Sequence, residues 1–339
     1  MKKLNSNEIS AYCENMAILL SSGVSVDEAV EIVCMEGNSL IAQAVNERFE
    51  LTLSDAMKKT GMFPTYTVDM IETGEATGKT EETLLGLANY YEKVSIHEKN
   101  ISDLILRPSI VMAVISGIML FIVLKLLPIF KEVYENLAGY MDLNTTTFFN
   151  LAALLGWIVF IVSMAISIVT LITWNNWKKN RDLNRAVSIF RRFTRFEKAI
   201  IETELAKFTD VLAIYIESGV DIITAVEKAS EFINHEKLKI SLDNCEEKVA
   251  QGVRLSQAMK EEKIYTSLNR RLLFTAESSG KLTQGLKALS NKQWETADET
   301  LRQVTETIEP TVLLAVTAFI GLLLISVMLP LVSIMASIC

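Results

Sequence analysis

The sequence predicts an all-α membrane protein with two homologous cytoplasmic helical-bundle domains and three transmembrane helices. One observation is an internal repeat, in which residues 54–132 reappear 202 positions later as residues 256–334. The other is composition: 50 % of the residues are hydrophobic although 22 % are charged. Apolar and polar residues must therefore be segregated along the chain, as they are in a membrane protein with large soluble parts.

The repeat extends from a soluble segment into an apolar one without losing register. In the soluble part, the segment 54–58 returns as 256–260, and in the apolar part Pro108 returns as Pro310. The duplicated unit was therefore a soluble domain already joined to a membrane span. This organisation is more typical of a scaffold than of an enzyme.

Residues 1–107 are predicted to form the first helical bundle. Apolar side chains recur there at the i, i+3, i+4, i+7 spacing of one buried helical stripe, and Gly23 ends the run as a C-terminal cap. Ser25 and Glu28 then have the spacing of a capping box that starts a second helix. The stripe consists of Ile9, Tyr12, Cys13, Met16, Leu19 and Leu20.

The next two predicted spans are residues 108–130 and 149–174, joined by a short extracytoplasmic loop, 131–148. A bilayer core about 30 Å thick needs about 20 apolar residues at helical rise. The first window meets this need with Lys125 as its one charged residue, and the second has no charge at all.

Residues 175–309 are predicted to repeat the bundle, and residues 310–336 form the third span. The buried stripe recurs, Gly219 ends it, and Asp221 is the expected N-cap of the following helix. Around this turn the repeat offset is 196, since Ser22-Gly23-Val24 matches Ser218-Gly219-Val220. The second stripe consists of Leu205, Phe208, Leu212 and Tyr215.

Charge predicts the orientation. Residues 178–198 contain eight basic residues against Asp182 and Glu197, whereas the 131–148 loop has only Lys131 against three acids. Because positive residues stay on the cytoplasmic side, we expect a cytoplasmic N-terminus and an extracytoplasmic C-terminus in a multi-pass protein of the cell membrane. The same basic run, placed after a span, is also suited to anionic lipid, so the lipid bilayer is an expected partner.

Nucleic acid, metals and cofactors are not expected. The bundles are acidic, with 9 basic and 17 acidic groups in residues 1–107, and would repel phosphate backbones. Four scattered cysteines and two histidines, His97 and His235, form no ligand pattern. The histidines lie among charged residues and are expected at the surface.

Thr73–Thr80 resembles a nucleotide-binding loop but lacks its pattern. Gly74 and Gly78 enclose three residues instead of four, and the preceding segment is helical rather than a strand. Both repeats keep a glutamate followed three residues later by Gly-Lys. We expect a turn whose glycine is left-handed, with the acid near the N-terminus of the next helix; a partner contact is the alternative. The six residues are Glu75, Gly78, Lys79, Glu277, Gly280 and Lys281.

Three further residues are candidates in or beside the spans. Lys125 is expected to extend to the outer interface, or else to contact an acidic group on a substrate helix. Pro108 and Pro310 lie where each bundle meets its span. They mark either the start of a span or a bend in a continuous helix, and we hypothesise that they act as joints between bundle and membrane.

Five motifs in this order resemble a known family, the inner-membrane assembly-platform proteins of type II secretion systems and type IV pili, with a length like that of the short competence-type members. Each motif is weak alone, but the ordered, duplicated set is specific. Two elements differ in the second copy, where Tyr265-Thr266 replaces Phe63-Pro64 and Ala276 replaces Gly74. The motifs are residues 20–24, 53–57, 61–64, 74–78 and 87–92.

The resemblance implies a function without catalysis. Such proteins engage a hexameric cytoplasmic assembly ATPase and pass pilin or pseudopilin subunits into a filament, together with other membrane components of the machine. It also implies that the protein forms a homo-oligomer. The protein is then not an enzyme, and no catalytic residue and no cofactor are expected. Because the two copies have diverged, we expect them to hold different partners or the same partner differently.

A small membrane transporter or a signalling receptor with duplicated cytoplasmic domains is the alternative. Against a transporter, the two repeats cross in the same direction and the spans hold only Lys125 as an ionisable group. Against a receptor, the external loop is short.

Overall fold

The computed structural model describes residues 3–36, 52–138 and 194–338, and most of an apolar helix between 150 and 172 (150, 153–154, 156–165, 167–169 and 171–172). Every regular element in these ranges is a helix, as predicted. The chain divides into two compact units, one made of residues 1–99 and 197–300 and the other of residues 100–196 and 301–339. Parts of the predicted 131–148 loop and 149–174 span, and most of the basic run 178–198, lie outside the described residues.

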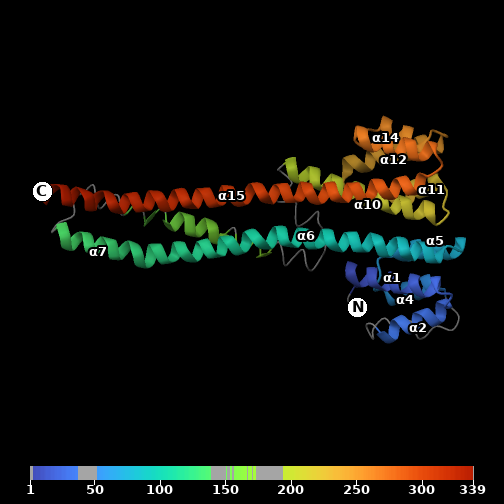
Figure 1. Ribbon diagram of the computed structural model, residues 1–339, viewed down its shortest axis with the longest axis horizontal. Coiled ribbons are helices and arrows are strands. Elements are labelled where there is room, and N and C mark those ends of the chain that lie inside the picture. The colour runs from blue at the N-terminus through green and yellow to red at the C-terminus, as the bar shows by residue number, and fades with distance from the viewer. Residues whose placement is uncertain are drawn as a thin grey trace. The chain divides into compact units, whose positions relative to one another are not determined.

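Within the described residues, the first half of the sequence contributes five helices to the first unit. They are α1 (Ser6–Ser21), α2 (Val26–Glu36), α4 (Leu53–Thr60), α5 (Thr65–Thr77) and the beginning of α6 (Thr80–Phe121). The second half contributes α10 (Thr194–Glu217), α11 (Ile222–Ser230), α12 (Glu236–Ala250), α13 (Leu255–Glu261), α14 (Ser267–Ser278) and the beginning of α15 (Leu282–Ile338). Figure 1 shows these helices in the colours of the sequence.

The predicted turns are confirmed. Gly23 and Gly219 adopt left-handed φ angles of +83° and +87°, which glycine reaches without strain. Asp221 caps α11 by accepting hydrogen bonds from the N–H groups of Ile223 and Thr224. Ser25 accepts one from the N–H of Glu28, where α2 begins.

The core of the first unit is shared by the two halves of the sequence. One continuous cluster of buried side chains includes Met16, Met70 and Leu87 from the first half and Phe208 and Leu212 from the second. The sequence predicts two bundles but not this joint core. Both copies are therefore parts of one packed body.

Two buried cysteines allow a test of this core. Burial raises the pKa of Cys13 and of Cys245 to about 12, from an ordinary value near 9. We expect both thiols to resist alkylation in the native protein, with no increase in rate as the pH rises from 7 to 9, because the reactive thiolate does not form there. Mass spectrometry after alkylation should detect both sites only in denaturant. Rapid labelling of the native protein would contradict this core.

The second unit contains the segment most suited to a membrane. Among the residues described, Ser109–Val133 is the one helical stretch long and apolar enough to span, and a shorter apolar helix covers Gly156–Val169. The stretch includes a five-residue π-helix, η1 (Ile122–Leu126), followed by α7 (Leu127–Ala138). The α15 backbone remains helical to Ile338, through the predicted third span.

Packing within the second unit depends on close approach of the apolar helices. Ile115, Met119 and Ile122 form a cluster with residues of the 156–169 helix and with Ile320 of α15. A Cβ atom on Gly156 would lie 2.5 Å from Cγ2 of Val123, so a larger residue here would force the Val123 side chain or the helices to shift. Small residues that allow such approach are typical of helix contacts in membranes.

Candidate functional site

The repeated glutamate caps the N-terminus of a helix in the same way in both copies. The Glu75 carboxylate accepts hydrogen bonds from the N–H groups of Leu53 (2.7 Å) and Ser54 (3.2 Å), at the N-terminus of α4. Glu277 does the same for Leu255 (3.0 Å) and Ser256 (3.1 Å) at the N-terminus of α13. A carboxylate there satisfies two unpaired donors and opposes the positive end of the helix dipole.

One detail of the predicted turn is therefore wrong. The prediction places each acid beside the helix that follows the turn, but Glu75 binds α4 and Glu277 binds α13, which precede it. The reason is that the α4–α5 and α13–α14 hairpins fold back and bring these N-termini within reach. Gly78 and Gly280 do have the left-handed φ angles expected of the turn, +70° and +69°.

Loss of these carboxylates should destabilise the protein unequally. In α4 the Thr52 side chain also accepts a hydrogen bond, from the N–H of Asp55, whereas the Arg254 N-cap of α13 supplies no side-chain bond. We therefore expect Glu277→Ala to cost about 2 kcal/mol and Glu75→Ala about 1 kcal/mol of unfolding free energy. Denaturant unfolding of the purified full-length chain measures both. Glu72→Ala, an exposed acid on α5, is the control, and equal losses in all three variants would contradict the capping role.

The lysine after the turn behaves differently in the two copies. Lys79 Nζ donates a hydrogen bond of 2.9 Å to the backbone carbonyl of Glu217, at the C-terminus of α10, where a cation is stabilised by the helix dipole. Its counterpart Lys281 is exposed. Lys79 thus joins the two halves, and this part of the repeat has diverged.

A polar seam continues this contact along α6, α10 and α15. We define it as Thr83 with Ser218, Lys93 with Asp210 and Trp294, and His97 with Thr203 and Asp298. Near it, burial lowers the pKa of Lys207, an effect that Glu204 and Glu98 oppose. The surface position expected for His97 is wrong: the side chain is buried, because α10 and α15 cover the face of α6 on which it lies. His235 is half-buried at the N-cap of α12.

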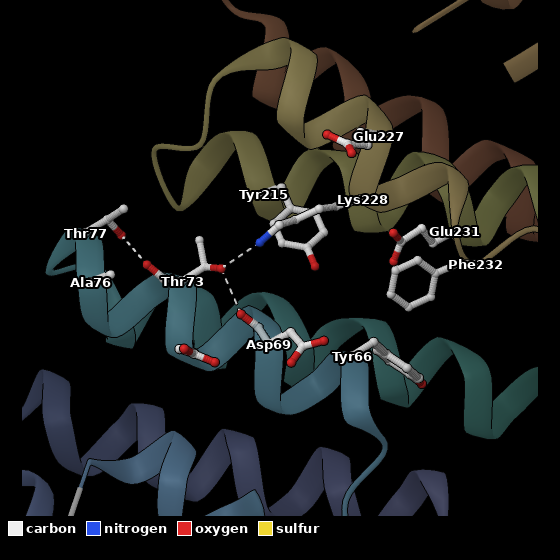
Figure 2. Close-up of a pocket in the computed structure, with 11 residues that line it drawn as sticks. Tyr66, Asp69, Thr73, Ala76, Thr77, Tyr215, Glu227, Lys228, Glu231 and Phe232 are labelled. Carbon is white, nitrogen blue, oxygen red and sulfur yellow. Dashed lines mark hydrogen bonds between the residues drawn. The ribbon is translucent and has the colours of Figure 1, made fainter. Parts of the chain in front are cut away.

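A cavity of about 490 Å³ opens between α5 and the α10–α11 pair. Figure 2 shows Tyr66, Asp69 and Thr73 on one wall and Tyr215 and Lys228 on the other. Lys228 Nζ lies 3.4 Å from Thr73 Oγ1 and 5.4 Å from the centre of the Tyr215 ring. Four carboxylates line the cavity with this one ammonium group, so its chemistry favours cations: Asp69, Glu72, Glu227 and Glu231.

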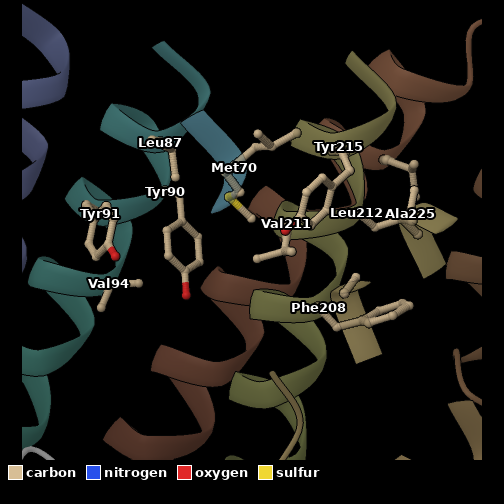
Figure 3. Close-up of a cluster of buried hydrophobic side chains, with 14 of the residues drawn as sticks. Met70, Leu87, Tyr90, Tyr91, Val94, Phe208, Val211, Leu212, Tyr215 and Ala225 are labelled. Carbon is tan, nitrogen blue, oxygen red and sulfur yellow. The ribbon is translucent and has the colours of Figure 1, made fainter. Parts of the chain in front are cut away.

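Apolar contacts beneath the cavity hold its walls together. Figure 3 shows Met70 and Tyr90 of the first half facing Val211 and Tyr215 of the second. Gly86 lies close to the second half here: a Cβ atom on it would lie 3.0 Å from Cγ1 of Ile214, so a larger residue would require the isoleucine to shift slightly. The two halves are therefore in direct contact at this point and share one buried cluster.

The candidate membrane residues lie within helices. Lys125 is exposed and belongs to η1, and the backbones of Pro108 and Pro310 are inside α6 and α15, away from either helix end. Both prolines are therefore positioned for a bend rather than for the start of a helix. Among the residues that the structure describes, no group of three or more metal-binding side chains occurs.

These features define a class: a helical protein with a duplicated bundle whose copies share one core and lead into apolar helices. The sequence profile of the type II secretion system protein F family matches residues 12–128 and 208–330, one region in each copy and more than half of the chain. The chain belongs to that family. The resemblance drawn from the five motifs is confirmed.

Curated relatives match over nearly the whole chain. A Pseudomonas putida protein named type 4 fimbrial assembly protein PilC is 23 % identical over 339 residues, covering 97 % of this chain and 84 % of the relative. Type II secretion system protein F of Xanthomonas campestris pv. campestris is 24 % identical over 342 residues, covering 97 % and 83 %. A Haemophilus influenzae protein is named as a protein transport protein HofC homolog and is 21 % identical, covering 97 % and 85 %.

Proposed function

We propose that this chain is the membrane assembly platform of a type IV pilus, type II secretion or competence pseudopilus machine. It would couple a cytoplasmic hexameric ATPase to the insertion of pilin or pseudopilin subunits into a filament. Family membership across both copies carries this proposal, supported by relatives named for fimbrial assembly and for type II secretion. Other membrane components of the machine and further copies of the chain would complete the assembly.

The proposed topology has three spans, 108–130, 149–174 and 310–336, with the N-terminus inside and the C-terminus outside the cell membrane. The Ser109–Val133 segment and the charge-free windows support it. The bundles, approximately 1–107 and 175–309, would both be cytoplasmic. The basic run 178–198 would then lie on the cytoplasmic side.

The proposed division of labour leaves ATP chemistry to the partner. The repeated Glu and Gly-Lys residues make structural contacts within the chain: Glu75 and Glu277 cap helices and Lys79 joins the halves. We therefore infer that the chain transmits motion rather than catalysing a reaction. Pro108 and Pro310, inside long helices, would be the flexible points, and Lys125 the residue that meets a substrate helix or the outer interface.

Deletion and complementation test the function. Without this chain, cells should retain their pilin or pseudopilin in the membrane but form no filament, and an affinity-tagged chain should co-purify the ATPase. A Pro108→Ala/Pro310→Ala chain should restore little assembly although it reaches the membrane in normal amounts. Normal filaments in the deletion strain would overturn the platform function, whereas full rescue by the proline variant would overturn only the joints.

Topology needs probes that are exposed in the folded protein. Cys13 and Cys245 are buried, so their failure to react would not report on which side they lie. Ile240 on α12 is exposed and suits a cysteine substitution in a background without Cys34. An impermeant thiol reagent on intact cells, or on spheroplasts where an outer membrane is present, should label Cys339 and spare Ile240→Cys until the cells are permeabilised. The reverse pattern would overturn the orientation.

A further inference from the structure

The two halves meet through unlike faces. The second half uses a stripe on α10, made of Asp210, Ile214 and Ser218, which we call the ridge face. The first half uses α5 and the beginning of α6, including Met70, Lys79 and Gly86, which we call the groove face. Lys79 and Gly86 contact Glu217 and Ile214, and Thr83 contacts Ser218.

Because the halves are repeats, each also carries the face that the other uses. The ridge face of the first half, at the offset of 196, is Glu14, Ile18 and Ser22 on α1. The groove face of the second half, at the offset of 202, is on α14 and the beginning of α15, and includes Leu272, Lys281 and Ala288. A pairing that was reciprocal would bring these two faces together within the same chain.

The structure shows that they do not meet. Ile214 is 3 % exposed but its counterpart Ile18 is 54 % exposed, and Glu14 and Ser22 are exposed as well. Met70 is fully buried but its counterpart Leu272 is 42 % exposed, beside exposed Leu268. Among the residues that the structure describes, one ridge face and one groove face therefore remain uncovered, both with apolar centres.

We propose that the groove face on α14–α15 of one chain binds the ridge face on α1 of a second copy of the same chain. The internal contact identifies the occupant, since it shows which surface covers a groove face in this fold. The proposal does not depend on the function proposed above, because it rests on the repeat and on the exposure of the two faces.

Some of the equivalent pairs keep the internal contact. Lys281 of one chain would donate to the backbone carbonyl of Ser21 of the next, as Lys79 does to Glu217. Ala288 would pack on Ile18, as Gly86 does on Ile214, with one methyl group more to accommodate. The exposed leucines Leu268 and Leu272 would be covered at the same time.

Two pairs are weaker than in the internal contact. Gly285 replaces Thr83, so the hydrogen bond to the serine is lost, and Glu295 replaces Lys93 opposite an acid, Glu14. Lys292, three residues earlier on the same face of α15, provides a cation within reach of Glu14. The contact between chains should therefore be weaker than the one within a chain, and should weaken further if Lys292 is removed.

The contact has a definite symmetry. Because unlike faces meet, each chain uses its groove on one neighbour and its ridge on another. Such heterologous contacts close into rings or continue as open assemblies, unlike the self-complementary contact of a simple two-fold dimer. Ile18 of one chain should consequently meet Ala288, and never Ile18, of another.

Disulfide cross-linking tests the pairing and its symmetry. A Cβ atom at Gly86 would lie 3.7 Å from the Cβ of Ile214, within the range of about 3.5–4.5 Å that a disulfide needs. The equivalent pair is Ala288 with Ile18. Two differently tagged full-length chains, one with Ile18→Cys and one with Ala288→Cys, both with Cys34 and Cys339 replaced by serine, are co-expressed and oxidised in isolated membranes.

We expect a cross-linked dimer that contains both tags, and little product from either variant alone. Chains with both substitutions should give a ladder of higher oligomers, and Lys292→Glu should reduce the mixed product severalfold. Ile240→Cys, exposed on α12, replaces Ala288→Cys in the control. A mixed product no stronger than this control, or Ile18→Cys chains joined to one another in preference, would overturn the proposal.

Discussion

Replacing Asp210 by alanine is expected to destabilise the first unit by about 3 kcal/mol. Both carboxylate oxygens of Asp210 lie 3.0 Å from Lys93 Nζ, and Trp294 Nε1 donates to Oδ2 at 2.9 Å. Removing a buried partner leaves a charge and an N–H group without compensation, which costs about 3–5 kcal/mol for a buried pair. The Lys93 side chain is 25 % exposed against 7 % for Asp210, so we expect the lower end of that range.

A double variant distinguishes the effect of losing the ion pair from the effect of losing side-chain packing. Lys93→Met/Asp210→Ala removes both charges, so it should be more stable than Asp210→Ala alone although it carries one more substitution. Denaturant unfolding of the full-length chain in detergent measures the difference. If the free energy of unfolding lost in the double variant equals the sum of the losses in the two single variants, the two side chains are not coupled. That result would contradict the seam.

A second large effect is expected at Gly285. A Cβ atom there would lie 2.1 Å from the Cβ of Ala276, where α14 meets α15. Since the neighbour is itself a Cβ atom on a helix, it cannot rotate away, and Gly285→Ala should cost about 3 kcal/mol. Adding Ala276→Gly should restore most of the stability, although a glycine within a helix costs about 1 kcal/mol of its own.

The first copy supplies the reason for this rescue. There the same two positions hold Gly74 and Thr83, and a Cβ atom on Gly74 would lie 2.5 Å from Thr83 Oγ1. Each copy thus has one glycine and one larger residue where its two helices cross. The glycine is on the first helix in the first copy (Gly74, with Thr83) and on the second helix in the second copy (Gly285, with Ala276). Thermal unfolding of the two Gly285 variants measures the effect. A double variant no more stable than Gly285→Ala would show that the crossing does not require one glycine.

Local features were the most predictable part of the molecule. The helical class, the glycine turns and the Asp221 cap follow from residues within one turn of each other, where backbone sterics and hydrogen bonding decide the outcome. The replacement of Gly74 by Ala276 is one of the elements in which the second copy differs from the first. It is a compensated exchange, and comparing positions 74 and 83 with 276 and 285 could have revealed it from the sequence.

Contacts between the halves were not predictable in this way. Lys79 binds a carbonyl far along the sequence, and His97 is buried by helices that begin about 100 and 185 residues later, so no nearby residue signals either contact. The expected surface position of His97 was wrong for this reason. Charged neighbours in the sequence are compatible both with the solvent-exposed face of a helix and with a buried polar seam. They therefore do not distinguish the two positions.

The π-helix η1 has a consequence for the repeated apolar segments. Residues 54–132 and 256–334 align without a gap, but the first copy accommodates one additional residue per turn at Ile122–Leu126 whereas α15 remains α-helical through the equivalent positions. One residue corresponds to about 100° of rotation in an α-helix. Beyond Leu126 the backbones of the two segments are therefore out of helical phase: two segments of one ancestry no longer keep the same rotation about their helix axes.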